Sequence, residues 1–268
     1  MRDLSKKTIV FTGASGYLGH AMALHLLECG AKVINLGRKE PEGFDDFPLA
    51  FHYEADLYDE EKTRECFRRI EKEHGNYQVL VNNSFDFSKN TGFNDESGRL
   101  EQISKATFMK GMESGIYWPF LCAQCAIPSM KQQGGGHIIN IGSLYGSLVP
   151  DAKMYEGRKI FNPVIYSLSK HALVALTKYL ASFLAKDGIR SNLLSPGIFP
   201  NTGRKQQHAG APNEMKDDEL GQILKSKCNL GRVGIPEDLL PSISFLCSDD
   251  SESMNGADIR VDGGFSLL

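Results

Sequence analysis

TIVFTGASGYLG, residues 8–19, is the stretch that decides the fold of this 268-residue chain. A β-branched apolar run passes directly into a glycine-rich turn, a helical pattern follows, and a second strand pattern begins at Lys32. Glycines in such a turn let backbone N–H groups approach phosphate oxygens at the helix N-terminus. An ordinary turn between packed elements is the alternative. The order of elements favours a pyrophosphate site formed by Gly13, Ser15, Gly16, Tyr17, Leu18 and Gly19.

Strand and helix patterns alternate along the whole chain, and most strand patterns are apolar almost continuously, as in parallel strands covered on both faces. Repeated βα units predict an α/β fold, a Rossmann-type doubly wound parallel sheet in a single domain over residues 1–268. The expected strands are Thr8–Phe11, Lys32–Leu36, Ala50–Tyr53, Val79–Val81, His137–Ile141, Arg190–Leu194 and Asp258–Val261. The expected helices are His20–Cys29, Asp59–Glu73, Phe108–Lys131, Val164–Lys186 and Pro236–Ser248.

Composition excludes several classes of protein. The 30 Lys and Arg nearly balance the 33 Asp and Glu, which argues against a nucleic-acid-binding surface. No apolar stretch approaches the roughly 20 residues of a membrane-spanning helix, and the polar start Met1–Lys7 is unlike a secretory signal. The six cysteines are scattered, as in a reducing compartment, and no histidine stands at metal-ligand spacing. We therefore expect a cytoplasmic protein without a metal, a nucleic-acid partner or a membrane anchor.

The end of the second strand indicates which nicotinamide cofactor binds. An acidic residue at this point would accept a hydrogen bond from the ribose 2′-OH of NAD. Here the strand runs into Gly37, Arg38 and Lys39, so no carboxylate is present. This favours NADP, with the planar guanidinium of Arg38 pairing the 2′-phosphate. NAD remains possible, because Arg38 could also be a solvated surface charge.

Tyr166 and Lys170 are candidates for acid–base chemistry. They stand four residues apart, so one face of the predicted helix carries both a phenol and an ammonium. A nearby cation stabilises phenolate and lowers the pKa of the phenol toward a useful range. Ser143 ends the fifth strand, where its hydroxyl could hold a substrate oxygen. The alternative is a surface Tyr/Lys pair, and the upstream glycine turn makes the catalytic interpretation the better one.

With these residues the chain resembles the short-chain dehydrogenase/reductase family, and the resemblance runs essentially from end to end. Beyond the glycine turn, it rests on ordered motifs in the rest of the sequence. These are Asp56-Leu57, Val81-Asn82-Asn83, Ser143, Tyr166, Lys170, Ser195-Pro196-Gly197, Gly231–Asp238 and Val261-Asp262-Gly263-Gly264.

The resemblance implies a role for each matching residue. Ser143 would orient the substrate oxygen, Tyr166 would transfer the proton, and Lys170 would hold the nicotinamide ribose and lower the tyrosine pKa. Members of the family form homotetramers or homodimers, which here implies contacts through Phe108–Lys131 and Val164–Lys186. The remaining implied cofactor contacts are Asp56 and Leu57 near the adenine, Asn82 near its ribose, and Pro196, Gly197, Ile198 and Thr202 near the nicotinamide.

Three positions depart from the family pattern. Tyr17 replaces the middle glycine of the turn, so its side chain would reshape the pyrophosphate site. Phe85 places an aromatic ring where the backbone of relatives passes close to the cofactor. Gly115 stands where relatives carry an asparagine that helps a water chain relay protons to the lysine. Water or Ser114 would have to take over this role in the proton relay. This departure predicts slow or atypical turnover.

Three segments break the regular pattern: Ser84–Ile103, an insertion at 149–163 and a charged stretch at 199–227. The insertion resembles that of family members from flagellin-glycosylation and nonulosonic-acid sugar clusters, although a solvated or dimer-contact loop is an equal alternative. We expect it to face the substrate, with Lys153, Arg158 or Lys159 holding a phosphate. Residues 199–227, with Arg204, Lys205 and His208, would form a lid.

The function predicted from sequence is an NADP(H)-dependent oxidoreductase that acts on a polar alcohol or ketone, with a sugar derivative as the first candidate. A 3-oxoacyl-carrier-protein-type or small-ketone reductase is one alternative. A dinucleotide-binding sensor or scaffold with weak catalysis is another, because Gly115, Tyr17 and Phe85 depart from the family pattern.

Overall fold

The computed structural model describes residues 2–157, 161–201 and 219–267. Its centre is a seven-stranded sheet, parallel throughout, in the order β3-β2-β1-β4-β5-β6-β7. The chain builds outward from β1 in one direction and then crosses to β4 and builds in the other, which confirms the doubly wound α/β fold. The strands are β1 (Thr8–Thr12), β2 (Lys32–Gly37), β3 (Ala50–Glu54), β4 (Val79–Asn82), β5 (Gly136–Ile141), β6 (Ile189–Pro196) and β7 (Asp258–Val261).

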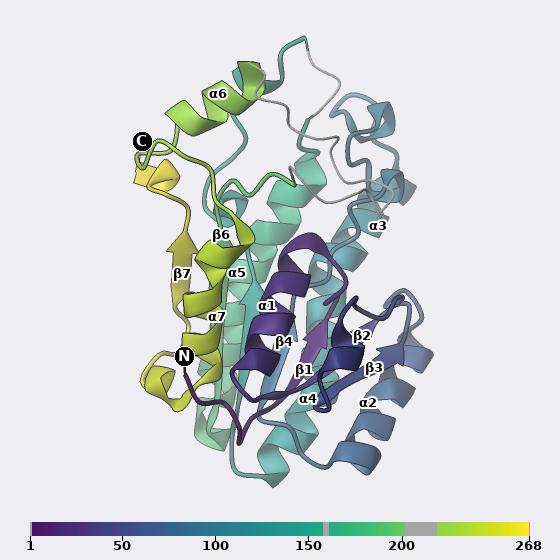
Figure 1. Ribbon diagram of the computed structural model, residues 1–268. Coiled ribbons are helices and arrows are strands. Elements are labelled where there is room, and N and C mark those ends of the chain that lie inside the picture. The colour runs from purple at the N-terminus through teal and green to yellow at the C-terminus, as the bar shows by residue number, and fades with distance from the viewer. Residues whose placement is uncertain (1, 158–160, 202–218, 268) are drawn as a thin grey trace.

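Helices cover both faces of the sheet (Figure 1). One apolar core joins α1 and α7 to the sheet, and a second core joins α2, α4 and α5 to the opposite face. Alternate strand residues enter the two cores, with Ile9 in the first and Val10 in the second. The helices are α1 (Tyr17–Glu28), α2 (Glu60–His74), α3 (Lys105–Met112), α4 (Trp118–Gln132), α5 (Val164–Leu184), α6 (Glu219–Ser226) and α7 (Leu240–Cys247).

The helix expected over Phe108–Lys131 is divided in the structure. Helix α3 begins earlier, at Lys105, and a π-helical turn over Glu113–Tyr117 separates it from α4. Pro119 has no N–H and therefore cannot donate to the carbonyl four residues earlier, at Gly115. The π-helical turn coincides with this missing hydrogen bond, and Gly115 lies within the turn.

A second difference is α6, which lies within the stretch expected to form a lid. Its eight residues carry an apolar stripe in which Leu220 and Leu224 are buried one turn apart. So short a helix gains its stability from packing rather than from propensity, which is why its sequence alone did not indicate it. It packs against Met154 of the 149–163 insertion.

The carboxyl ends of the strands point toward the top of Figure 1, the end at which α3 and α6 lie. The carboxyl edge of a doubly wound sheet is where its ligands bind, so this end positions the candidate site. No helix in the described ranges is long and apolar enough to cross a membrane.

Candidate active site

Two asparagine side chains hold the glycine turn that follows β1. Asn83, just beyond β4, donates through Nδ2 to the carbonyls of Thr12 at 3.1 Å and Gly13 at 3.0 Å. Asn35, fully buried in β2, accepts from the backbone N–H of Ala14 at 2.9 Å. Gly13 has a φ of +72°, a left-handed conformation that favours glycine. The turn is therefore fixed to the strand on each side of β1.

The turn has the shape of a phosphate cradle. A Cβ at Gly19 would lie 2.5 Å from the Gly13 carbonyl oxygen and 2.6 Å from Asn83 Nδ2, so only glycine allows this close approach. Helix α1 begins directly after Gly16, and no side chain caps its N-terminus. The positive end of the helix dipole faces the turn, which suits an anion. The residues present therefore fit the pyrophosphate of a dinucleotide.

Tyr17 and Leu18 follow the turn and point away from each other. The Tyr17 hydroxyl donates to the Pro200 carbonyl at 3.1 Å, so the side chain reaches the segment after β6. Leu18 packs against the core beneath α1. Ser15 is partly exposed at the turn itself. The tyrosine that replaces the family's glycine thus connects the turn to the opposite wall of the site.

The residues expected near the adenosine lie at the same edge of the sheet. Arg38 directly follows β2, is exposed, and forms no ion pair with any described residue. The carboxylate of Asp56 accepts from the Tyr58 N–H at 3.1 Å, and Leu57 is buried in the second core. The Asn82 side chain is used internally, because its Nδ2 donates to Pro119 O and Asn140 Oδ1. A ribose contact from Asn82 would therefore come from its backbone.

Ser143, Tyr166 and Lys170 converge beyond β5. Ser143 is 8% exposed, and hydrogen bonding with its hydroxyl acts to lower the pKa of Tyr166, against the larger effect of burial, which raises it. Lys170 is 5% exposed, and its Nζ donates to the Ile141 carbonyl at 2.8 Å. Burial lowers the pKa of Lys170 to about 8, so the ammonium is charged at neutral pH and loses its proton as pH rises past 8.

Aromatic rings surround the Tyr166 phenol on the side of the β4–α3 segment. The rings of Phe85, Phe93 and Phe87 have centroids 5.1, 5.3 and 5.9 Å from that of Tyr166, the first two edge-to-face. Lys170 Nζ lies 5.7 Å from the Phe85 ring centroid. These rings contribute to the burial that raises the pKa of Tyr166 and lowers that of Lys170, although Tyr166 keeps an intermediate exposure toward the pocket.

The Phe85 ring packs closely against Gly115. A Cβ at Gly115 would lie 2.4 Å from both Cβ and Oγ of Ser169 and 3.0 Å from the Phe85 ring. The space that an asparagine side chain would need is therefore filled by Ser169 and Phe85. Ser114 does not replace it, because its hydroxyl donates to the Gly111 carbonyl at 3.3 Å. The two departures from the family pattern form one packed arrangement.

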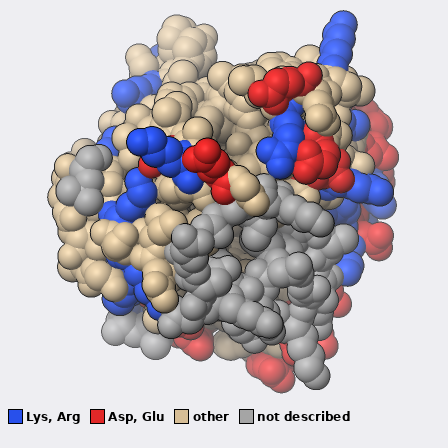
Figure 2. Space-filling model, turned by 90° about the horizontal axis from the view of Figure 1, so that it is seen from above, with Lys and Arg blue, Asp and Glu red and all other residues tan. Residues whose placement is uncertain are grey.

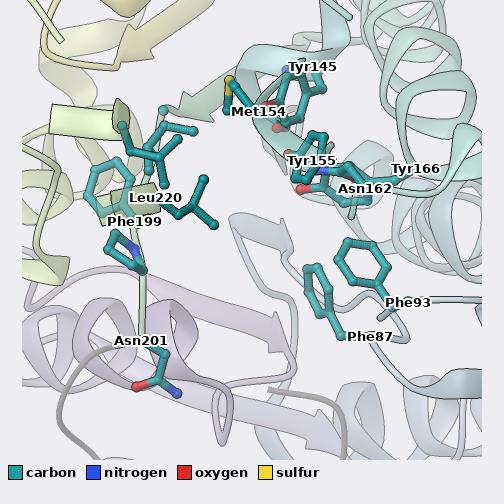
Figure 3. A pocket seen from close by; sticks show the side chains of 15 residues that line it. Phe87, Phe93, Tyr145, Met154, Tyr155, Asn162, Tyr166, Phe199, Asn201 and Leu220 are labelled. Carbon is teal, nitrogen blue, oxygen red and sulfur yellow. Dashed lines mark hydrogen bonds between the residues drawn. The ribbon is translucent and has the colours of Figure 1, made fainter. Parts of the chain in front are cut away.

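A pocket of about 220 Å³ opens in front of Ser143 and Tyr166 (Figure 3). Each of the three irregular segments contributes to its lining: Phe87 and Phe93, then Met154, Tyr155 and Asn162, then residues 199–201 with Leu220 and Leu224. Gly197 and Ile198 line it as well. Of the lining residues, the sequence predicted Ser143, Tyr166, Gly197 and Ile198, but not the aromatic, aliphatic and amide side chains of the irregular segments. The sequence feature that indicates these segments is the break in the βα pattern. Such a break locates a segment but does not indicate which of its side chains face the substrate.

One of the expected substrate contacts lies away from this pocket. Lys153 is exposed and does not line it. Thr202, Arg158, Lys159, Arg204, Lys205 and His208 lie outside the described residues. No group of three or more metal-ligating side chains is found among those that are described.

Comparison with known proteins identifies the family. A family model described as Enoyl-(Acyl carrier protein) reductase matches residues 13–266. A 7alpha-hydroxysteroid dehydrogenase of Bacteroides fragilis is 28% identical, over 100% of this chain and 97% of its own. A short-chain dehydrogenase of Leptospira borgpetersenii, solved with bound NAD+, is 28% identical with a TM-score of 0.81, covering 99% and 96% of the two chains. A gluconate 5-dehydrogenase of Burkholderia cenocepacia, solved with NADP and tartrate, is 25% identical with a TM-score of 0.81, covering 99% and 97%.

The chain therefore belongs to the short-chain dehydrogenase/reductase family, as its motifs predicted. It is an NAD(P)-dependent oxidoreductase.

The packing around Gly115 generates a first prediction. Gly115→Ala should lower the free energy of unfolding by about 1–3 kcal/mol, because its methyl group overlaps Ser169. Chemical denaturation of wild type, Gly115→Ala, Ser169→Gly and the double variant measures this cost. The cost should shrink in the Ser169→Gly background, and equal costs in both backgrounds would show that the two residues are not coupled.

Proposed function

We propose that the chain catalyses NADP(H)-dependent hydride transfer at a carbon bearing a secondary hydroxyl or a carbonyl group. The observation that carries the proposal is that Ser143 and Tyr166 line the pocket with Lys170 buried behind them, at the same sheet edge as a glycine turn that fits a dinucleotide. This arrangement argues against a sensor without catalysis.

Each of the three residues has a distinct task. Ser143 holds the substrate oxygen at the pocket wall, and Tyr166 gives a proton to that oxygen or removes one. The Lys170 ammonium stabilises the phenolate that forms when the proton leaves. Its bond to the Ile141 carbonyl holds Nζ in place, and two of its three donors are available to a cofactor ribose. The nicotinamide, when bound, supplies or accepts the hydride; Pro196, Gly197 and Ile198 would face it, with Thr202 at its carboxamide.

NADP is the proposed cofactor because the position after β2 carries a cation and no carboxylate. Arg38 is exposed at the carboxyl edge, where a 2′-phosphate would lie. One structural relative holds NAD+ and another holds NADP, so the preference depends on this chain's own residues. Asp56, Leu57 and Asn82 would form the adenosine end of the site.

A sugar derivative is the proposed first substrate class. Aromatic rings beside Tyr166 can stack on the C–H face of a sugar ring, and the gluconate 5-dehydrogenase relative acts on a sugar acid. We further propose that the 149–163 insertion is of the sugar-cluster type that its sequence resembles, which would favour the same class. A more hydrophobic alcohol is the second candidate, since the pocket lining is largely apolar and one relative is a hydroxysteroid dehydrogenase.

We also propose a homodimer or homotetramer in which α4 and α5 contact a second copy. Phe120 on α4 and Leu168, Tyr179 and Phe183 on α5 are exposed by 42–59%. The Tyr179 and Phe183 rings stack with centroids 4.1 Å apart. Exposed aromatic residues on neighbouring helices favour association. A cytoplasmic location stays a prediction.

Tyr166→Phe should abolish turnover and leave NADPH affinity unchanged. The substitution removes the hydroxyl that transfers the proton but keeps the ring that packs against Phe85 and Phe93. NADPH oxidation with a panel of sugars, polyols and ketones measures turnover, and nicotinamide fluorescence measures binding. Equal rates in wild type and variant would remove Tyr166 from the mechanism.

Arg38→Ala should weaken NADPH binding about tenfold or more, because a charge-assisted hydrogen bond to phosphate contributes about 1.5–3 kcal/mol. NADH binding should change little. Lys39→Ala removes an equal charge one residue further along and is the matched control, with a smaller effect expected. Tighter binding of NADH than of NADPH by the wild type would contradict the assignment.

Replacing Tyr179 and Phe183 together by serine should shift the protein toward smaller species in sedimentation velocity. The change removes the largest exposed aromatic surface of α5. Lys178→Ala, on an exposed neighbouring position, should leave the oligomeric state unchanged. A wild-type protein that is monomeric at micromolar concentration would contradict the proposed contact.

A further inference from the structure

The pocket has two largely apolar walls, which face each other in Figure 3. Phe87 and Phe93 stand with Tyr166 on one wall, with the Phe87 and Phe93 ring centroids 4.9 Å apart. Phe199 and Leu220 form the other. Both walls offer carbon surface, so a flat or ring-shaped molecule can bury its C–H faces between them.

No charged side chain lines the pocket in the part of the chain that is described. Among the described cations near these segments, Lys227 pairs with Asp151 at 2.8 Å and Lys153 is exposed, while the buried Lys170 donates to the Ile141 carbonyl. Around the grey residues on the end of the molecule that holds the site, Figure 2 shows Lys and Arg lying among Asp and Glu. The described walls would therefore remove the hydration of an anionic substrate without themselves supplying a counter-charge.

The pocket does contain neutral hydrogen-bonding groups in addition to Ser143 and Tyr166. The side-chain oxygens Oδ1 of Asn162 and Asn201 are buried and have no hydrogen-bond partner within the described ranges. A buried carbonyl oxygen without a donor is unfavourable, so a ligand that supplies O–H or N–H groups would gain from both. Asn162 lies beside Tyr155 and Tyr166, whereas Asn201 lies below Phe199 (Figure 3).

The volume of the pocket limits the size of the molecule. About 220 Å³ is below the usual range of about 300–1,000 Å³ for ligand sites. Gly197 and Ile198 line this pocket and would also face the nicotinamide, so the cofactor would take part of the volume. One ring with its substituents suits the remaining space better than a polycyclic skeleton.

We propose that this pocket selects uncharged single-ring alcohols or ketones that carry a second hydroxyl or amide N–H group, and that it disfavours phosphorylated and acidic substrates. The proposal rests on the proposed hydride transfer at Ser143 and Tyr166, and it narrows the substrate class of that site. It also assigns Asn162 and Asn201 as specificity residues that accept hydrogen bonds from the substrate.

Two probes that differ in charge but share a ring and a ketone test the selectivity: 3-oxocyclohexanecarboxamide and 3-oxocyclohexanecarboxylate. Calorimetry on the full chain saturated with NADP+ measures their Kd values without turnover. NADPH oxidation measures kcat/KM for the same two ketones. We expect the carboxamide to bind at least tenfold more tightly and to show at least tenfold higher kcat/KM. Equal or stronger binding of the carboxylate, or binding of neither probe, would overturn the proposal.

Two variants of the same insertion separate specific recognition from general packing. Asn162→Leu keeps a side chain of similar size but removes the acceptor, so carboxamide affinity should fall about tenfold, as for the loss of one hydrogen bond. KM should carry this loss, with kcat little changed. Lys153→Met should alter neither probe's affinity, and retained NADP+ affinity shows that both variants are folded. An unchanged carboxamide affinity in Asn162→Leu, or a loss of carboxylate affinity in Lys153→Met, would contradict the assignment.

Calorimetry and NADPH oxidation together also distinguish the proposed selectivity from the proposed hydride transfer on which it rests. Selective binding of the carboxamide without any NADPH oxidation would contradict hydride transfer and support the selectivity of the pocket. NADPH oxidation that favours the carboxylate would support hydride transfer and overturn the selectivity.

Discussion

The glycine turn after β1 is held by two asparagine amides, and the arrangement of the site depends on this constraint. Asn83 binds the turn's carbonyls from the β4 side, and Asn35 binds its N–H from the β2 side. Parallel pairing brings the ends of β1, β4, β5 and β6 to one edge. A dinucleotide seated on the turn would therefore lie at the same edge of the sheet as Ser143, which follows β5.

Dehydration of Lys170 is the second important feature. The lysine is buried and is anchored to the Ile141 carbonyl, and Phe85 covers it on the side where relatives carry a polar relay residue. Gly115 permits this cover, because any larger side chain would collide with Ser169 and Phe85. The unusual glycine and the unusual phenylalanine therefore have one structural explanation, which preserves the Tyr166/Lys170 pair.

The substrate side is built from segments that contribute little to the sheet. Their positions are coupled by contacts distant in sequence: Lys227 with Asp151, Arg99 over the Phe161 ring, and Tyr17 with Pro200. Such connections let loops form a defined pocket on a rigid edge. Their described residues line the pocket with aromatic, aliphatic and amide side chains, and their charged side chains Arg99, Asp151 and Lys227 are not among those that line it.

The sequence by itself determined the parallel sheet, the glycine turn and the family, because strand and helix periods and motif order are local properties of the chain. It also placed Ser143 and Tyr166 at one edge, since consecutive βα units must end there. Only the tertiary structure decided that α3 and α4 are separated at Gly115, that α6 forms at all, and that Asn162 lies beside Tyr166. Those outcomes depend on packing between residues far apart in the chain, where shape and burial override local preference.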